Sequence, residues 1–208
     1  MKYIKLFDNY NPKSILLIVD VQKSFKKFFS ELYINQLIKY CNNFTDVYQV
    51  FDNHVDGKNV DKDYLYSDSP LLPVNGDLYE FPNQKDLIEK RYNYDVDADF
   101  YKKILSKEIY KEIKSKEGKL KKGDYFPTTE GTIIVYIGNN HQWFHVPKKL
   151  YDLFQSFKEA QSEGEGVITI VGGARNECLT DIVTAAETLG VKTKIDHLYT
   201  YSATHCYF

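Results

Sequence analysis

The sequence predicts an α/β fold in which a doubly wound, mostly parallel sheet carries helices on both faces. Three observations lead to this prediction. Short apolar runs rich in β-branched residues recur along the chain, and longer stretches with apolar residues at helical spacing separate them. Strands that alternate with helices form βαβ units, whose strands run parallel. No internal repeat or linker divides the 208 residues, so we expect a single domain over 1–208.

The first elements follow from apolar patterning. "SILLIVD" (14–20) predicts a buried strand because it is short, β-branched and bounded by polar residues. Apolar residues at helical spacing predict a helix over 24–43, and "DVYQVFD" (46–52) predicts a second strand. Residues 53–85 are rich in Asp, Asn, Pro and Gly, which indicates a long loop.

The middle of the chain predicts a strand, a helix and another strand. "DLIEKR" (86–91) is a short strand that ends in positive charge. Residues 97–118 form a helix, with Asp97 as a candidate N-cap and Gly118 as its stop. "GTIIVYIG" (131–138) predicts a further strand of the sheet.

The C-terminal part continues the alternation. A helix begins near Pro147, which suits a first helical turn, and ends at Gly164, while Gly190 closes the next helix. The predicted helix, strand, helix and strand span 146–164, 166–173, 178–189 and 192–197.

Composition limits the function classes. The 27 basic and 29 acidic residues nearly balance, which argues against a nucleic-acid-binding protein. Three widely separated cysteines form no disulfide framework, so a cytoplasmic location is expected. The longest apolar run is "ILLIV", and the N-terminus lacks the apolar stretch of a signal peptide, so no membrane partner is expected.

Three reactive side chains follow predicted strands. Asp20 closes the first strand, Lys90 closes "LIEK", and Cys178 follows "VITIVGGARNE". Because ligands of open parallel sheets bind beyond the carboxyl ends of the strands, we expect these residues to meet at one edge.

The chemistry of these three residues indicates nucleophilic catalysis by the thiol. A free thiol has a pKa of about 8.5. The N-terminus of a helix and Lys90 would lower the pKa of Cys178, and Asp20 could take its proton. Two glycines before Cys178 let backbone N–H groups approach a developing oxyanion. The alternative is that Cys178 is a small buried core residue.

Three segments then resemble a known family. "LLIVDVQKSF", "LIEKRYNYD" and "VGGARNECLTDIVTAAETLG" resemble, in order, the aspartate, lysine and nucleophile segments of the isochorismatase-like cysteine hydrolases, which include the nicotinamidases. The resemblance covers about residues 14–100 and 165–205. Arg175 and Ile182 stand where the family pattern has threonines.

The resemblance implies roles for individual residues. Cys178 would attack a carboxamide carbonyl and form a thioester, Asp20 would carry the proton, and Lys90 would balance the charges. It also implies a cis peptide bond between Gly173 and Ala174, with the N–H groups of Ala174 and Cys178 as the oxyanion hole.

Two aromatic residues are candidates for substrate binding. Phe25 stands where the family's phenylalanine lines the pocket, although a core role is an open alternative. The stretch 114–146 reads as an insertion, and near its end "NNHQWFHV" contains Trp143. This cluster is either a hairpin packed by its own aromatics or a wall that stacks on a flat substrate.

No cofactor is required by this chemistry, but zinc or another divalent metal stays open. "FDNHVDG" places Asp52 and His54 one residue apart after a strand, as in the nicotinamidase metal site. No histidine occurs in 55–140 to supply the family's further ligand, so a polar pocket wall is the alternative.

The expected function is therefore cysteine-dependent hydrolysis of a C–N bond in a small carboxamide. A catalytically idle relative that binds an aromatic or nucleotide-like ligand, or a partner protein, is the alternative. A Rossmann dinucleotide site is disfavoured because "VGGARNE" lacks the GxGxxG spacing. The resemblance is compatible with a homo-oligomer, and the oligomeric state stays open.

Overall fold

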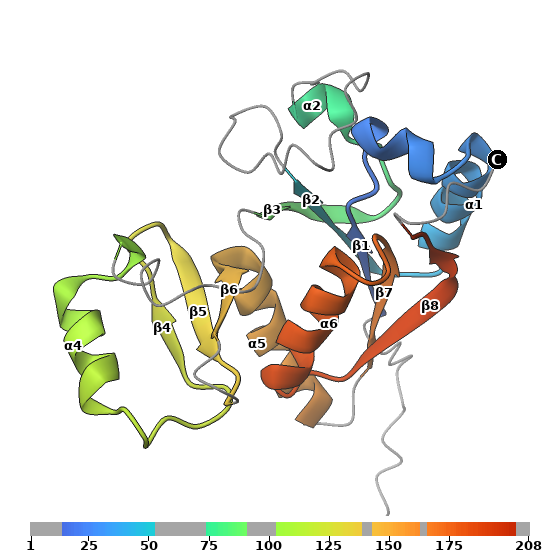
Figure 1. The fold of residues 1–208 in the computed structure, drawn as a ribbon. Helices are drawn as coiled ribbons and strands as arrows, with labels where there is room; N and C mark the ends of the chain where they lie inside the picture. The colour runs from blue at the N-terminus through green and yellow to red at the C-terminus, as the bar shows by residue number, and fades with distance from the viewer. Residues whose placement is uncertain (1–13, 53–73, 91–102, 139–142, 163–165, 203–208) are drawn as a thin grey trace, which may run out of the picture.

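The centre of the molecule is a five-stranded sheet whose strands all run parallel (Figure 1). It is seen in a computed structural model that describes residues 14–52, 74–90, 103–138, 143–162 and 166–202. The strands are β1 (Ile15–Val19), β2 (Asp46–Asp52), β3 (Gln84–Lys90), β7 (Ile168–Gly172) and β8 (Thr193–Thr200). Their order is β3–β2–β1–β7–β8, so the chain proceeds outward from β1 in both directions. The α/β prediction is confirmed, and the order is compatible with a doubly wound sheet.

Strand β1 divides its side chains between two hydrophobic cores. Ile15, Leu17 and Val19 lie in one core with apolar residues of two helices, and Leu16 and Ile18 lie in the other with residues of a third. The helices on the first side are α5 (Lys148–Ser162) and α6 (Cys178–Thr188), and the helix on the second is α1 (Glu31–Cys41). All five residues of β1 are buried, which explains why the strand is apolar throughout.

The helix expected over 24–43 is two helices. A 3₁₀ helix, η1 (Lys23–Phe28), ends before Phe29, whose backbone is extended. Ser30 then caps α1, because its hydroxyl accepts a hydrogen bond of 3.2 Å from the N–H of Tyr33. The prediction of one continuous helix is wrong because Ser30 begins a new helix, although the helical spacing of apolar residues continues across it.

The strand expected at 131–138 exists, but it lies in a second sheet. This strand, β5 (Thr132–Tyr136), pairs antiparallel with β4 (Tyr125–Pro127) and with β6 (Trp143–Pro147). The expected insertion 114–146 therefore contains β4, β5 and most of β6. The prediction that β5 joins the parallel sheet is wrong.

Burial on both faces explains this error. Ile133 and Val135 belong to the same core as α5 and α6. Ile134 and Tyr136, on the opposite face, pack in a third cluster against Ile109 of helix α4 (Lys107–Ser115). A strand covered on both sides is apolar at every position, whether its neighbours are parallel or antiparallel.

The other elements lie near their expected positions. Helix α4 covers the second half of the expected helix 97–118, with Ser106 as its N-cap, and residues 91–102 lie outside the described ranges. The expected loop 53–85 is interrupted, because a short helix, α2 (Val74–Asp77), lies within it and β3 begins at its end, while residues 53–73 lie outside the described ranges. No helix in the described part of the chain has the length and hydropathy to cross a bilayer.

Candidate active site

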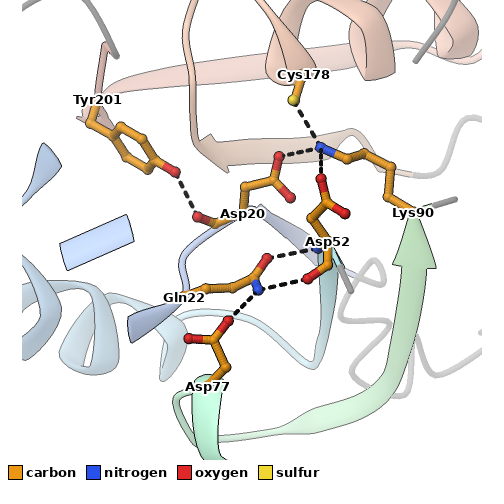
Figure 2. A network of polar contacts seen from close by, with 7 residues as sticks. All are labelled: Asp20, Gln22, Asp52, Asp77, Lys90, Cys178 and Tyr201. Carbon is orange, nitrogen blue, oxygen red and sulfur yellow. Dashed lines mark hydrogen bonds and ion pairs between the residues drawn. The ribbon is translucent and has the colours of Figure 1, made fainter. Parts of the chain in front are cut away.

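Three parallel strands bring the predicted reactive residues to one edge of the sheet. Asp20 directly follows β1, Lys90 is the last residue of β3, and Cys178 is the first residue of the helix after β7. Figure 2 shows the three side chains pointing toward one another. The parallel register accounts for this, because Val19 lies opposite Val50, and Asp52, two residues further along β2, lies opposite Lys90.

The ammonium group of Lys90 is the centre of the cluster. Its Nζ donates hydrogen bonds to Asp20 Oδ2 at 2.6 Å and to Cys178 Sγ at 2.9 Å. Asp52 Oδ2 lies 3.6 Å from the same nitrogen. The Lys90 residue is only 3% exposed and Asp20 only 2%, so water screens these charges little. One buried cation therefore faces two carboxylates and one sulfur.

Main-chain contacts fix the orientation of Asp20. Its φ is 51°, in the left-handed region, where a short polar side chain is better tolerated than a branched one. Its N–H donates to the carbonyl of Val50 at 2.9 Å, and its own carbonyl accepts a 2.6 Å hydrogen bond from the hydroxyl of Tyr201. Within the described chain, Oδ1 of Asp20 is buried and has no hydrogen-bond partner, so this oxygen can accept a proton.

The thiol of Cys178 is protonated at neutral pH. Its pKa is raised to about 12, chiefly by burial and then by the charge of Asp20, while Lys90 acts in the opposite direction. Lys90 lowers this pKa as expected, but burial and the charge of Asp20 outweigh it, so the expectation of a net lowering is wrong. Burial disfavours the thiolate, and the carboxylate that could take the proton also repels the anion.

Close packing explains the two glycines before the nucleophile. Gly172 has a φ of 97°, and a Cβ there would lie 2.0 Å from the carbonyl oxygen of Val19. A Cβ on Gly173 would lie 2.5 Å from the ring of Tyr201. The following peptide bond, between Gly173 and Ala174, is cis, as the resemblance implies.

The turn before α6 and the first residue of that helix contain two backbone N–H groups without an acceptor in the described part of the chain. Within the described chain, the structure contains no hydrogen bond donated by the N–H of Ala174 or by that of Cys178. The carbonyl of Ala174 instead accepts hydrogen bonds from Glu177 and Leu179, which ties the turn to the start of α6. The free N–H groups belong to the residues expected to form the oxyanion hole.

Gln22 links the end of β2 to Asp77 and thereby supports the cluster. The side chain of Gln22 accepts a hydrogen bond from the N–H of Asp52 at 2.7 Å and donates to the carbonyl of Asp52 at 2.9 Å. Its amide also donates to Asp77 at 2.7 Å (Figure 2). Asp77 in turn accepts hydrogen bonds from the backbone N–H and the hydroxyl of Ser24. Gln22 thereby holds the end of β2, and with it the Asp52 carboxylate near Lys90.

The described residues do not by themselves make a metal site. Of the two expected ligands, His54 lies outside the described ranges, and the carboxylate of Asp52 forms an ion pair with Lys90. No group of three or more His, Cys, Asp or Glu with metal-binding geometry occurs among the described residues. A metal cation at Asp52 would compete with the ammonium of Lys90 for the carboxylate.

The two aromatic candidates lie in different surroundings. Phe25 is half-buried, in the second of the cores described above, with its ring centroid 6.3 Å from that of Phe28. Trp143 is buried in the second sheet, where its ring packs against Phe126 and Tyr136 at 5.9 and 5.0 Å. Neither contact places these rings against the three reactive residues, and their role in substrate binding stays a prediction.

Four residues near the cluster were not singled out by the sequence. They are Gln22, Asp77, Asp181 and Tyr201. Gln22 lies inside the resemblance segment, and Asp181 follows Cys178 by three residues, the spacing of one helix face. The pKa of Asp181 is raised to about 6 by burial, with Lys90 opposing the shift and Glu177 adding to it. Asp77 and Tyr201 carried no such signal, because only folding brings them to the site.

Comparisons with known proteins found no match for this chain. No protein-family model, no curated protein and no solved structure matches the chain. The site geometry and the motif resemblance are therefore the grounds on which a function can be proposed.

Proposed function

We propose that this protein is a cysteine-dependent hydrolase that cleaves a C–N bond in a small carboxamide. The observation that carries the proposal is the position of the Lys90 ammonium, which contacts both the carboxylate of Asp20 and the sulfur of Cys178. An acid–base group and a nucleophile that share one buried cation can exchange a proton without changing the net charge of the site. The resemblance to isochorismatase-like hydrolases points to the same chemistry.

The first half-reaction forms a thioester. The thiol proton of Cys178 passes to Asp20 as the sulfur attacks the carbonyl carbon, and Lys90 stabilises the sulfur while it carries negative charge. The carbonyl oxygen becomes an oxyanion, and the free N–H groups of Ala174 and Cys178 are suited to bind it. Asp20 then gives the proton to the nitrogen, the C–N bond breaks, and ammonia or an amine leaves.

The second half-reaction releases the acid. Water loses a proton to Asp20 and attacks the thioester carbon, and a second oxyanion forms at the same N–H groups. The C–S bond breaks, the carboxylic acid is released, and the proton on Asp20 returns to the sulfur. One water is consumed and both residues regain their starting protonation states.

A catalytically idle protein that binds a small ligand or a partner is the second candidate. The raised pKa of the Cys178 thiol favours it, because a protonated thiol is a weak nucleophile unless Asp20 accepts the proton. The two candidates differ in one measurable property, which is turnover that depends on Cys178.

Ammonia release from a panel of small carboxamides tests the proposal. Cys178→Ala should abolish release while the thermal unfolding curve stays close to that of the unchanged protein. Cys41→Ala is the matched control, because Cys41 is fully buried in the core beside α1 and is not part of the cluster. Release that survives in Cys178→Ala would remove Cys178 from the role of nucleophile and overturn the proposal. No release from any carboxamide by the unchanged protein would favour the binding protein.

A further inference from the structure

Tyr201 contacts two parts of the candidate site, the main chain of Asp20 and the turn at Gly173. Its hydroxyl donates a 2.6 Å hydrogen bond to the carbonyl of Asp20, the residue proposed to carry the proton. The edge of its ring lies against Gly173, so closely that a Cβ on that glycine would be 2.5 Å from the ring. Figure 2 shows the phenol extending from the end of the β8 segment to Asp20.

The backbone of Tyr201 brackets the same turn. Its N–H donates to the carbonyl of Gly172 at 3.0 Å, and its carbonyl accepts a 2.9 Å hydrogen bond from the N–H of Arg175. Gly173 and Ala174, the residues on either side of the cis peptide bond, lie between these two hydrogen bonds. One residue therefore holds the turn at both ends as well as through its ring.

The ring itself is held firmly. It stacks on Phe28 with centroids 6.0 Å apart and contacts Phe29 at 5.2 Å and Tyr33 at 6.4 Å. The pKa of Tyr201 is raised well above its ordinary value, chiefly by burial and then by the charge of Asp20. The hydroxyl is therefore a permanent donor, and the Asp20 carbonyl is its acceptor.

We infer that Tyr201 is a positioning residue that sets two parts of the site separately: its hydroxyl orients Asp20, and its ring supports the turn that carries the Ala174 N–H. This inference rests on the proposed function, because it assigns Tyr201 to the proton carrier and to the oxyanion hole of that reaction. The two roles are separable, because one depends on a single oxygen atom and the other on the ring.

Two probes of Cys178 separate the roles. Alkylation by iodoacetamide requires a thiolate but no oxyanion hole, because no carbonyl is attacked. Acyl transfer from p-nitrophenyl acetate requires both, since its carbonyl oxygen becomes an oxyanion. Each reaction is measured from pH 6 to 9, and alkylation is followed at the Cys178 peptide by mass spectrometry.

Tyr201→Phe removes the oxygen and keeps the ring. We expect it to change the pH profile of Cys178 alkylation and to lower the rate at pH 7 about tenfold, which corresponds to about 1.4 kcal/mol. Tyr201→Leu also removes the ring, so the acyl-transfer rate should fall at least a further tenfold, with alkylation equal to that of Tyr201→Phe. Tyr199→Phe is the matched control, because that ring stacks on Tyr40 at 4.1 Å, away from the cluster, and it should leave both rates unchanged.

Each outcome decides the inference. Rates of Tyr201→Phe within twofold of the unchanged protein, with the same pH profile, would overturn the role of the hydroxyl. Losses of equal size in both reactions, matching the unfolded fraction from thermal melts, would show that Tyr201 serves stability alone. If the Leu variant does not fold, Tyr201→Phe still decides the role of the hydroxyl, and Gly173→Ala, which places a methyl group against the ring, tests the role of the ring by the same comparison of acyl transfer with alkylation. If Cys178 is alkylated but no acyl transfer depends on it, the proposed function is contradicted. The pH profile of alkylation in Tyr201→Phe would still test the role of the hydroxyl.

Discussion

The proton of Cys178 is expected to move to Asp20 rather than to water, and the pH dependence of thiol reactivity tests this. With a pKa of about 12, only about one thiol in 10⁵ would lose its proton to water at pH 7. Loss to water would raise the alkylation rate tenfold for each pH unit, or about a hundredfold from pH 7 to pH 9. Transfer to Asp20 keeps the proton in the site, so the rate should change by less than about twofold over that range.

Asp20→Asn is the perturbation that separates the two routes. Asparagine cannot take the proton, but it also removes a charge that raises the pKa of the thiol, while the Lys90 ammonium stays 2.9 Å from the sulfur. Alkylation of this variant should therefore regain a tenfold rise for each pH unit, until a pKa below 12 is reached. Release of ammonia from an amide should be lost, because nothing protonates the leaving nitrogen.

The assay is iodoacetamide labelling between pH 7 and pH 9, read at individual peptides by mass spectrometry. Cys41 serves as an internal control, because burial raises the pKa of its thiol to about 12 as well, and it lies in the apolar core beside α1. Its labelling should rise with pH in every sample. A tenfold rise per pH unit at Cys178 of the unchanged protein would refute proton transfer to Asp20.

Three further predictions concern single residues of the cluster. Lys90→Met removes the ammonium that contacts the buried carboxylate of Asp20 and that of Asp52, so we expect a loss of about 3–5 kcal/mol in the free energy of unfolding, measured by urea denaturation; a loss below about 1 kcal/mol would contradict the ion-pair argument. Gly173→Ala places a methyl group against the Tyr201 ring and should cost about 1–3 kcal/mol in the same measurement. In the double variant Gly173→Ala/Tyr201→Leu part of that loss should be recovered, because the ring that the methyl group meets is absent. Strictly additive losses in stability would argue against the contact. Asp181 ionises as the pH rises through about 6, and its carboxylate then interacts with the Lys90 ammonium that also stabilises the sulfur, so alkylation of Cys178 should fall a few-fold between pH 5 and pH 7. Asp181→Asn should abolish this step, and a step that persists belongs to another group.

The site carries more negative charge than the surroundings of a reactive thiolate usually do, and this affects how the thiol can lose its proton. One described cation, Lys90, contacts Asp20, Asp52 and the sulfur together. Forming a free thiolate would add a third negative charge around one ammonium, which is unfavourable in a buried site. Internal transfer of the proton avoids that state, because Asp20 becomes neutral at the moment the sulfur becomes charged. The raised pKa of Cys178 is therefore compatible with catalysis as long as Asp20 faces the thiol.

The positions of Asp20, Lys90 and Cys178 at strand ends could be predicted from the sequence. Buried parallel strands are short, β-branched runs, so their ends are visible in the pattern, and their carboxyl ends share one edge of the sheet. The same argument failed for residues 131–138, because a strand covered on both faces has the same pattern in an antiparallel sheet. Here the run Ile133–Ile134–Val135 serves two different cores.

The alternation of strands and helices and the meeting of the three reactive residues could be inferred without the structure, because both follow from local periodicity and from the geometry of parallel strands. Three properties could be seen only after folding: the ion pair between Asp52 and Lys90, the contacts of Tyr201 with Asp20 and Gly173, and the rise of the thiol pKa. These properties depend on burial and on contacts between segments up to 181 residues apart, as between Asp20 and Tyr201. Local patterns record which residues are apolar, but the electrostatic energy of a group depends on everything that surrounds it after folding.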